Sequence, residues 1–150
     1  MSNFKVIIVD DERLSRRRIR RLLALEHDCE VIGECANGTE ALATLGRVRP
    51  DILFLDVQMP ELDGFEVIQA LTQLRPLIIF TSAYDEYALR AFEVHAFDYL
   101  LKPFDGRRFR ESVQRAKARV AQERSGTPDH RRRFRTRSRS ARHRWRWPAS

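Results

Sequence analysis

Apolar and polar residues follow one another along this chain in blocks that predict five buried strands. Val6–Val9, Ile52–Leu55 and Leu77–Phe80 are short, continuous apolar runs, which are typical of strands covered on both faces of a parallel sheet. Val31–Ala36 and Tyr99–Leu101 are more mixed or shorter runs that we also predict to be strands.

Between these strands, apolar residues recur at helical spacing. The predicted helices cover residues 13–25, 39–48, 64–74, 86–94 and 105–123. In the last of them, intervals of four, three and four residues place on one face the side chains of Phe109, Val113, Ala116 and Val120. Five strands that alternate with five helices predict a doubly wound α/β fold, in which helices cover both sides of a parallel sheet.

The first predicted helix carries an apolar stripe and a run of arginines. We expect its inner face to consist of Leu14, Ile19, Leu22 and Leu23. The arginines at positions 16, 17, 18, 20 and 21 are expected largely outside. Such a run is more often a solvated helix face than a contact for an acidic partner.

Polar residues follow the predicted strands at the edge where the carboxyl ends of parallel strands meet. Asp10 and Asp11 follow the first strand, Asp56 the third, Thr81 the fourth and Lys102 the fifth. Three carboxylates repel one another unless a cation neutralises them, and oxygen ligands favour Mg²⁺. A lysine supplies positive charge for a phosphoryl oxygen, and a threonine supplies a hydroxyl. This set of side chains predicts in-line phosphoryl transfer with an aspartate as the nucleophile.

With these motifs in place, the sequence resembles the receiver domains of two-component response regulators over residues 4–123. The resemblance rests on Val9-Asp10-Asp11-Glu12, on Asp56 followed by Met59-Pro60 and Asp63-Gly64, on Thr81, and on Tyr99-Leu100-Leu101-Lys102-Pro103-Phe104. It implies a flavodoxin-like receiver domain over residues 1–124, phosphorylated by a sensor histidine kinase. Such a domain is expected to lose its phosphoryl group slowly by itself rather than to act as an enzyme, and to form a homodimer when phosphorylated.

The resemblance also implies roles for single residues. Asp56 would be the phospho-acceptor. Asp11, Asp56 and the backbone carbonyl of Gln58 would hold Mg²⁺, and Asp10 would act on the ion through water. Lys102 would bind the phosphoryl group.

Thr81 and Tyr99 would form a switch pair, in which the hydroxyl moves toward the phosphate and the ring turns inward. The Lys102–Pro103 bond would be cis. A narrower resemblance, over Phe80–Tyr99, is to receivers of LytTR-type (LytR/AlgR-like) transcriptional regulators. In these a DNA-binding LytTR domain normally follows, whereas 27 residues follow Glu123 here, too few for that domain.

The charge of the chain is concentrated near its C-terminal end. Residues 125–150, which we call the basic tail, hold nine arginines and one acid, whereas the first 124 residues hold 19 basic and 20 acidic residues. This low-complexity tail is predicted to be disordered. One interpretation is an arm that binds nucleic acid without sequence preference, with Phe134, Trp145 and Trp147 stacking on bases. The other, which we favour because the change in composition is abrupt, is a frameshift that replaced a linker and a DNA-binding domain.

Several function classes are excluded by the remaining residues. Cys29 and Cys35 do not form a redox or zinc motif. No apolar run approaches the roughly 20 residues that cross a bilayer, so we expect a cytoplasmic protein without a membrane partner. A haloacid-dehalogenase-type phosphatase needs a second aspartate two residues after its nucleophile. Gln58 occupies that position after Asp56, so this class of enzyme is excluded. His95 falls in a helix-to-strand connection, where a structural role is favoured over a phosphorelay role.

Overall fold

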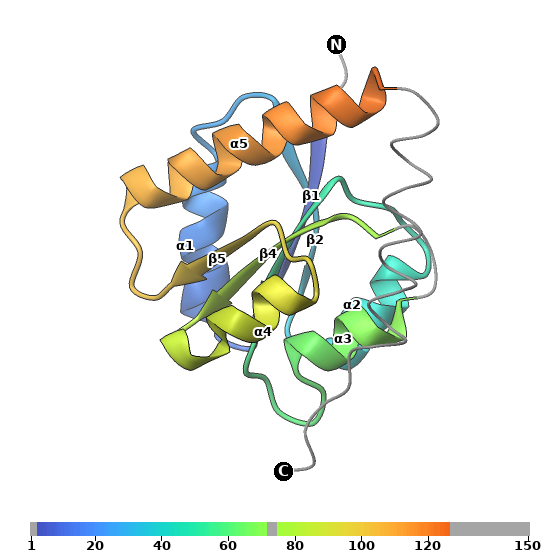
Figure 1. Ribbon diagram of the computed structural model, residues 1–150, viewed down its shortest axis with the longest axis vertical. Helices are drawn as coiled ribbons and strands as arrows, with labels where there is room; N and C mark the ends of the chain where they lie inside the picture. Colours follow the sequence, from blue (N-terminus) through green and yellow to red (C-terminus); the bar gives the residue numbers. More distant parts are fainter. Residues whose placement is uncertain (1–2, 72–74, 127–150) are drawn as a thin grey trace.

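The sheet consists of five parallel strands, as the apolar runs predict. In the computed structural model, which describes residues 3–71 and 75–126, they are β1 (Phe4–Val9), β2 (Cys29–Cys35), β3 (Ile52–Asp56), β4 (Leu77–Ser82) and β5 (Asp98–Leu101). Their order across the sheet is β2-β1-β3-β4-β5, and all neighbouring pairs are parallel. The carboxyl ends of the strands therefore meet at one edge of the sheet (Figure 1).

Helices cover both faces of this sheet. They are α1 (Arg13–Leu23), α2 (Gly38–Leu45), α3 (Gly64–Ala70), α4 (Ala88–Glu93) and α5 (Gly106–Arg124), with a short 3-10 helix, η1 (Asp85–Tyr87), directly before α4. The side chains of α1 and α5 pack with Val6 and Ile8 in one core, and those of α2, α3 and α4 pack with Ile7 and Val9 in a second core. Successive strand residues point to opposite faces, so one strand supplies both cores. The predicted doubly wound α/β fold is confirmed.

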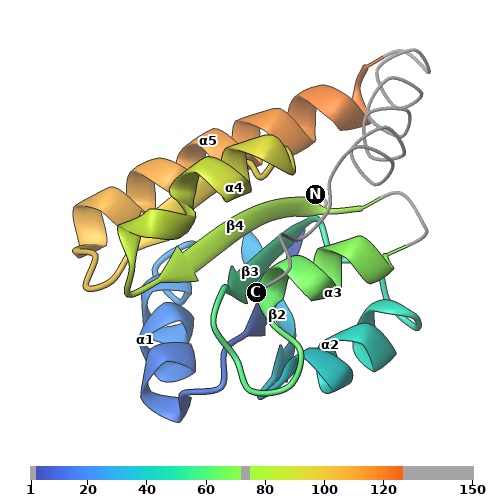
Figure 2. The same cartoon turned by 60° about the horizontal axis from the view of Figure 1, so that its bottom comes forward.

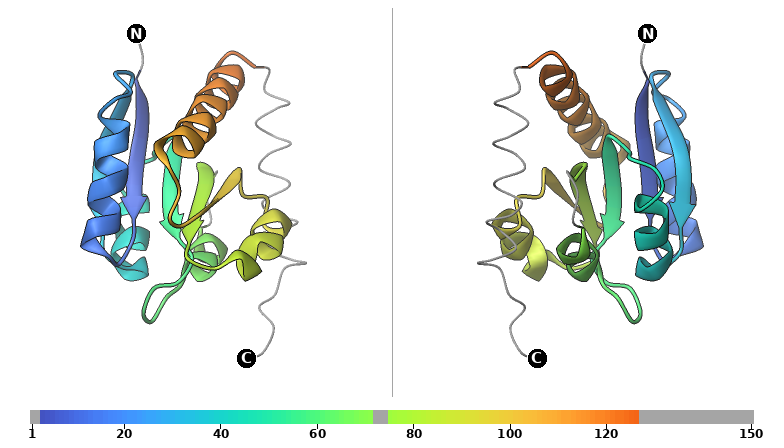
Figure 3. Two further views of the ribbon diagram at one scale, coloured as in Figure 1. Left: turned by 90° about the vertical axis from the view of Figure 1, so that its left-hand side faces the viewer. Right: turned by 90° about the vertical axis from the view of Figure 1, so that its right-hand side faces the viewer.

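Two further views locate the helices around the sheet. Helix α3 lies on one side of β4 and α5 on the other (Figure 2). Helix α1 lies beside β1 and β2, far from α4 at the other end of the sheet (Figure 3). Within the described residues, no helix combines the length and the apolar composition that crossing a membrane requires.

The prediction for the inner face of α1 was wrong at two residues. Leu14, expected inside, is 76% exposed, whereas Ile19 and Leu23 are buried. Arg16, expected outside, has a side chain that is only 18% exposed. The cause is the phase of the helix. Leu14 lies five residues before Ile19, about 140° around the helix axis, whereas Arg16 lies three residues before it and shares its face.

Several predicted element boundaries also differ from the structure. Helix α1 ends two residues early, α2 ends at Leu45, and the predicted helix over residues 86–94 is divided into η1 and α4. Helix α3 ends at Ala70. Residues 72–74 of the predicted third helix lie outside the described residues, as do residues 127–150 of the basic tail.

Candidate functional site

Three carboxylates gather at the carboxyl edge of the sheet. Asp10 directly follows β1 and is completely buried, and Asp56 ends β3 and is 5% exposed. These strands are neighbours, with Val9 paired to Leu55, so the next residue along each strand brings the two acids together. With the exposed Asp11, they offer oxygen atoms that all lie within 4.8 Å of one another. The predicted acidic cluster is therefore present.

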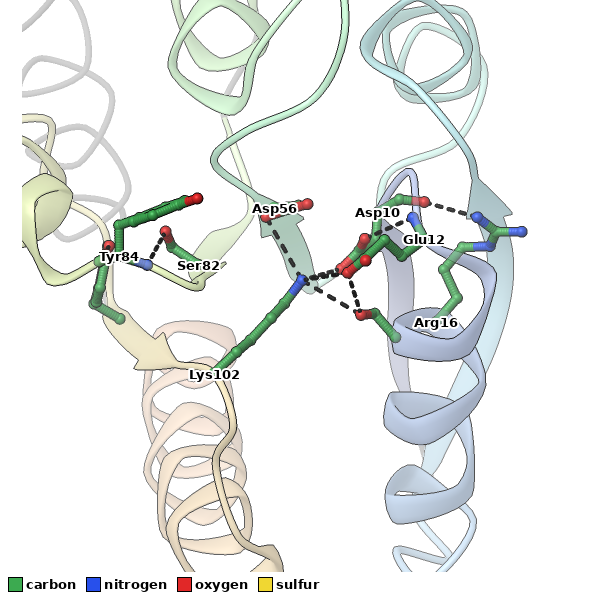
Figure 4. A network of polar contacts seen from close by, with 9 residues as sticks. Asp10, Glu12, Arg16, Asp56, Ser82, Tyr84 and Lys102 are labelled. Atoms are coloured by element: carbon green, nitrogen blue, oxygen red, sulfur yellow. Dashed lines mark hydrogen bonds and ion pairs between the residues drawn. The ribbon is translucent and has the colours of Figure 1, made fainter.

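Lys102 reaches this cluster from the end of β5. Its Nζ lies 2.9 Å from Oδ2 of Asp10, 3.8 Å from Oδ1 of Asp56 and 3.4 Å from the hydroxyl of Ser15 (Figure 4). The backbone N–H of Lys102 donates to the carbonyl of Ser82 at 2.7 Å, which fixes the root of the side chain. The Lys102–Pro103 bond is cis, as expected.

The charges of the cluster are only partly compensated by the protein. Burial and the neighbouring Asp10 raise the pKa of Asp56 to about 8, although Lys102 opposes this shift. Burial lowers the pKa of Lys102, but the hydrogen bond to Asp10 and the charge of Asp56 outweigh it, so the net pKa is raised. Three crowded acids beside one lysine leave an excess of negative charge. Hard oxygen ligands at this spacing fit Mg²⁺, which neutralises such an excess.

Thr81 lies directly beside Asp56 in the sheet. The two residues are paired across β3 and β4, and Thr81 is 1% exposed. Its hydroxyl has no hydrogen-bond partner among the described residues. A buried polar group without a partner is uncommon and calls for an explanation, such as a ligand that it meets in another state.

Tyr99 and Gln58 are directed toward the connection between β4 and α4. The hydroxyl of Tyr99 donates to the backbone carbonyl of Tyr84. The side-chain amide of Gln58 donates to the hydroxyl of Tyr87 at 2.6 Å, and the ring of Tyr87 packs edge-on against Tyr84 at 6.3 Å. The three tyrosines of the chain thus lie together at the connection between β4 and α4. The metal-binding role of the Gln58 carbonyl stays a prediction.

Sequence reasoning missed the contacts that Arg16 and Ser15 make beside the cluster, although it did include Gly64 in the motif that follows Asp56. Arg16 donates to the backbone carbonyl of Asp10 at 2.8 Å, and Ser15 donates to Glu12 at 3.1 Å. Gly64 is required by close packing, because a Cβ atom there would lie 2.5 Å from the carbonyl oxygen of Asp56. The spacing of Arg16 from Ile19 was the available signal for the arginine.

Comparisons with known proteins agree with this geometry. A model of the response regulator receiver domain matches residues 6–114. The transcriptional regulatory protein BtsR of Salmonella typhi is 50% identical over 122 residues, which make up 81% of this chain and 49% of that protein. BtsR of Escherichia coli K12 is 49% identical with the same coverage. The chain spans about half the length of the curated relatives it matches.

Solved structures show the same similarity. The response regulatory domain of mrkE from Klebsiella pneumoniae is 35% identical and superimposes with a TM-score of 0.75, covering 79% of this chain and 98% of that one. The REC domain of AraT from Geobacillus stearothermophilus is 38% identical with a TM-score of 0.75, covering 81% of this chain and 98% of that one. Both similarities extend over nearly the whole of a receiver domain.

Proposed function

This chain belongs to the response regulator receiver domain family, and on that premise we propose that a sensor histidine kinase phosphorylates it on Asp56. The observation that carries the proposal is the buried carboxylate of Asp56 with Asp10, Asp11 and Lys102 gathered around it. No other carboxylate cluster of this kind is found among the described residues. The domain acts as a phospho-acceptor and switch rather than as a turnover enzyme.

The transfer is a substitution at phosphorus. A carboxylate oxygen of Asp56 forms the new bond to phosphorus while the bond to the phosphohistidine nitrogen breaks, and the imidazole leaves. The ammonium of Lys102 stabilises the phosphoryl oxygens. Asp11, Asp56 and the backbone carbonyl of Gln58 would hold Mg²⁺, with Asp10 acting through water, and the ion would supply positive charge for the phosphoryl oxygens. Burial and the neighbouring Asp10 raise the pKa of Asp56, and a cation held at this cluster would lower that pKa and so favour the ionised nucleophile.

Labelling with acetyl phosphate tests this proposal. We expect one acid-labile phosphoryl group per chain, only when Mg²⁺ is present, and none on Asp56→Asn, which keeps the size of the side chain and removes the nucleophile. Lys102→Ala is expected to bind Mg²⁺ but to transfer or switch poorly. Asp28→Asn, which removes a carboxylate in the connection between α1 and β2 that pairs with Lys117 and is not part of the cluster, is the matched control. Undiminished labelling of Asp56→Asn would rule out the assignment.

The response to phosphorylation is proposed to run through Thr81 and Tyr99. The unpartnered hydroxyl of Thr81 lies beside the phospho-acceptor and is free to meet a phosphoryl oxygen. Movement of the Thr81 hydroxyl would change the space next to Tyr99. In this structure the hydroxyl of Tyr99 donates to the carbonyl of Tyr84 in the β4–α4 connection. That connection leads into the surface formed by α4, β5 and α5, where Leu89 and Phe92 are 68% and 78% exposed. We propose that this surface forms a two-fold symmetric homodimer.

The proposed regulatory class is that of LytTR-type transcriptional regulators, because residues Phe80–Tyr99 resemble the receivers of that class. Curated relatives named as transcriptional regulatory proteins support a transcriptional output. The proposed receiver domain ends at residue 124, the last residue of α5. A second candidate function, sequence-independent nucleic-acid binding, is favoured by the nine arginines of the basic tail.

A further inference from the structure

Arg16 occupies an unusual place for a residue in an exposed arginine run. Its side chain is 18% exposed and lies against the backbone of Asp10, whereas the side chain of Arg20, four residues later, is 52% exposed. The Nη1 atom of Arg16 donates to the backbone carbonyl of Asp10 at 2.8 Å (Figure 4). A hydrogen bond from a charged donor is shorter and stronger than one from a neutral donor.

The carbonyl that Arg16 contacts belongs to the peptide group joining Asp10 to Asp11. A peptide group is planar, so fixing this oxygen also fixes the direction in which the chain enters Asp11. The other polar groups of Asp10 are already bonded: Oδ1 accepts from the N–H of Glu12 at 2.9 Å, and Oδ2 accepts from Lys102 at 2.9 Å. Arg16 therefore completes the restraint on the segment that presents two of the three carboxylates.

Glu34 on β2 holds the guanidinium in position. Its Oε1 lies 3.5 Å from Nε of Arg16, and its Oε2 accepts from Arg20. The planar guanidinium presents donors in two directions at once, so it bonds the Asp10 carbonyl while remaining paired with Glu34. Lysine has a single nitrogen and cannot reproduce both contacts with the same geometry.

We propose that Arg16 is a positioning residue for the metal and phosphoryl chemistry of Asp56, acting through the Asp10–Asp11 peptide and braced by Glu34. This inference rests on the proposed function. Groups that orient the ligands of a metal without touching it commonly change metal affinity by 10- to 100-fold. Because Arg16 acts through one peptide group, we expect its loss to weaken Mg²⁺ binding by an amount near the lower end of this range, roughly tenfold.

Calorimetric titration with Mg²⁺ tests the role. Arg16→Ala is expected to bind Mg²⁺ roughly tenfold more weakly, and Arg16→Lys to recover part of the loss. The control is Arg20→Ala, which removes the other arginine bonded to Glu34 and leaves the Asp10 carbonyl bond intact. Acetyl phosphate labelling of Arg16→Ala should approach the wild-type rate at saturating Mg²⁺, because the defect lies in holding the ion.

The possible outcomes are distinguishable. If Arg16→Ala and Arg20→Ala bind Mg²⁺ alike and as tightly as the wild type, the inference is overturned. If circular dichroism shows that Arg16→Ala does not fold, Glu34→Gln is measured in its place. This variant keeps Arg16 but removes the carboxylate that pairs with its guanidinium. Unchanged Mg²⁺ affinity in Glu34→Gln would then also contradict the proposal. If the wild-type protein neither binds Mg²⁺ nor takes a label, the proposed function fails instead.

Discussion

At the scale of single residues, the hydroxyl of Thr81 is expected to have opposite effects on stability and on function. It is buried without a partner among the described residues, and an unsatisfied buried group destabilises the folded state. We expect Thr81→Val, which has nearly the same shape, to raise the free energy of unfolding by roughly 1 kcal/mol, measured by urea denaturation. The same variant should lose the conformational response to the phosphoryl mimic beryllofluoride, because no hydroxyl is left to meet it.

Thr44→Val is the matched control for this prediction. The hydroxyl of Thr44 has a partner, the thiol of Cys35, at 3.5 Å. Removing a hydroxyl that is already bonded should not stabilise the protein. A Thr81→Val protein that is less stable than the wild type would show that the hydroxyl is satisfied in the folded state.

At the scale of secondary-structure elements, Asp98 attaches α5 to the sheet. Its carboxylate, on β5, accepts from Arg108 at 2.9 and 3.0 Å and from Arg115 at 3.3 Å. Burial raises the pKa of Asp98, but the hydrogen bonds from Arg108 outweigh it, so the net pKa lies below its usual value. The ionised carboxylate is thus the form that the fold stabilises.

A lowered pKa determines the direction of the pH dependence. The stabilisation is fully present above the unfolded-state pKa of about 3.9 and is lost as the pH falls through the lower folded-state value. We therefore expect Asp98→Asn to melt below the wild type at neutral pH, with a difference that shrinks as the pH drops below about 4. Arg107→Ala, at a site 89% exposed, is the control and should leave the melting profile unchanged. A constant difference at all pH values would contradict this account.

At the scale of the whole molecule, the apolar surface of α4 and β5 predicts assembly. Leu89, Phe92 and Leu101 are 68%, 78% and 44% exposed. Light scattering should show a dimer with Mg²⁺ and beryllofluoride, and a monomer for Phe92→Ser under the same conditions. Leu25→Ser is the matched control, since Leu25 is 74% exposed but belongs to the α1 end of the molecule. An identical monomer mass with and without the mimic would exclude the proposed dimer.

The uneven charge of the whole chain leads to a second prediction at this scale. If about six of the nine tail arginines engage phosphates, log K for duplex DNA should fall with log salt concentration at a slope near −5. Deleting residues 125–150 should abolish this binding and leave Asp56 phosphorylation nearly unchanged. Titrating one random duplex and one promoter-like duplex at several salt concentrations measures both effects. Sequence-selective binding that survives the deletion would point to a DNA-binding surface within residues 1–124.

The sequence by itself determined the alternating order of strands and helices, and with it the edge at which Asp10, Asp56 and Lys102 meet. It does so because buried parallel strands are continuous apolar runs, and because their right-handed connections bring every carboxyl end to one side. The residues that end those runs therefore lie at one edge of the sheet. Asp10 and Asp56 follow neighbouring strands, and Lys102 reaches them from β5 with its long side chain.

Only the tertiary structure decided which way individual side chains face. The prediction assigned residues of α1 to a face by their chemical type, and only the packing of α1 against the sheet showed that Arg16 faces inward and Leu14 outward. The unpartnered hydroxyl of Thr81 and the ion pairs between Asp98 and α5 likewise depend on how separate elements pack against one another. Periodicity indicates that an element has an inner face, but the rotation that selects this face is set by packing against the rest of the molecule.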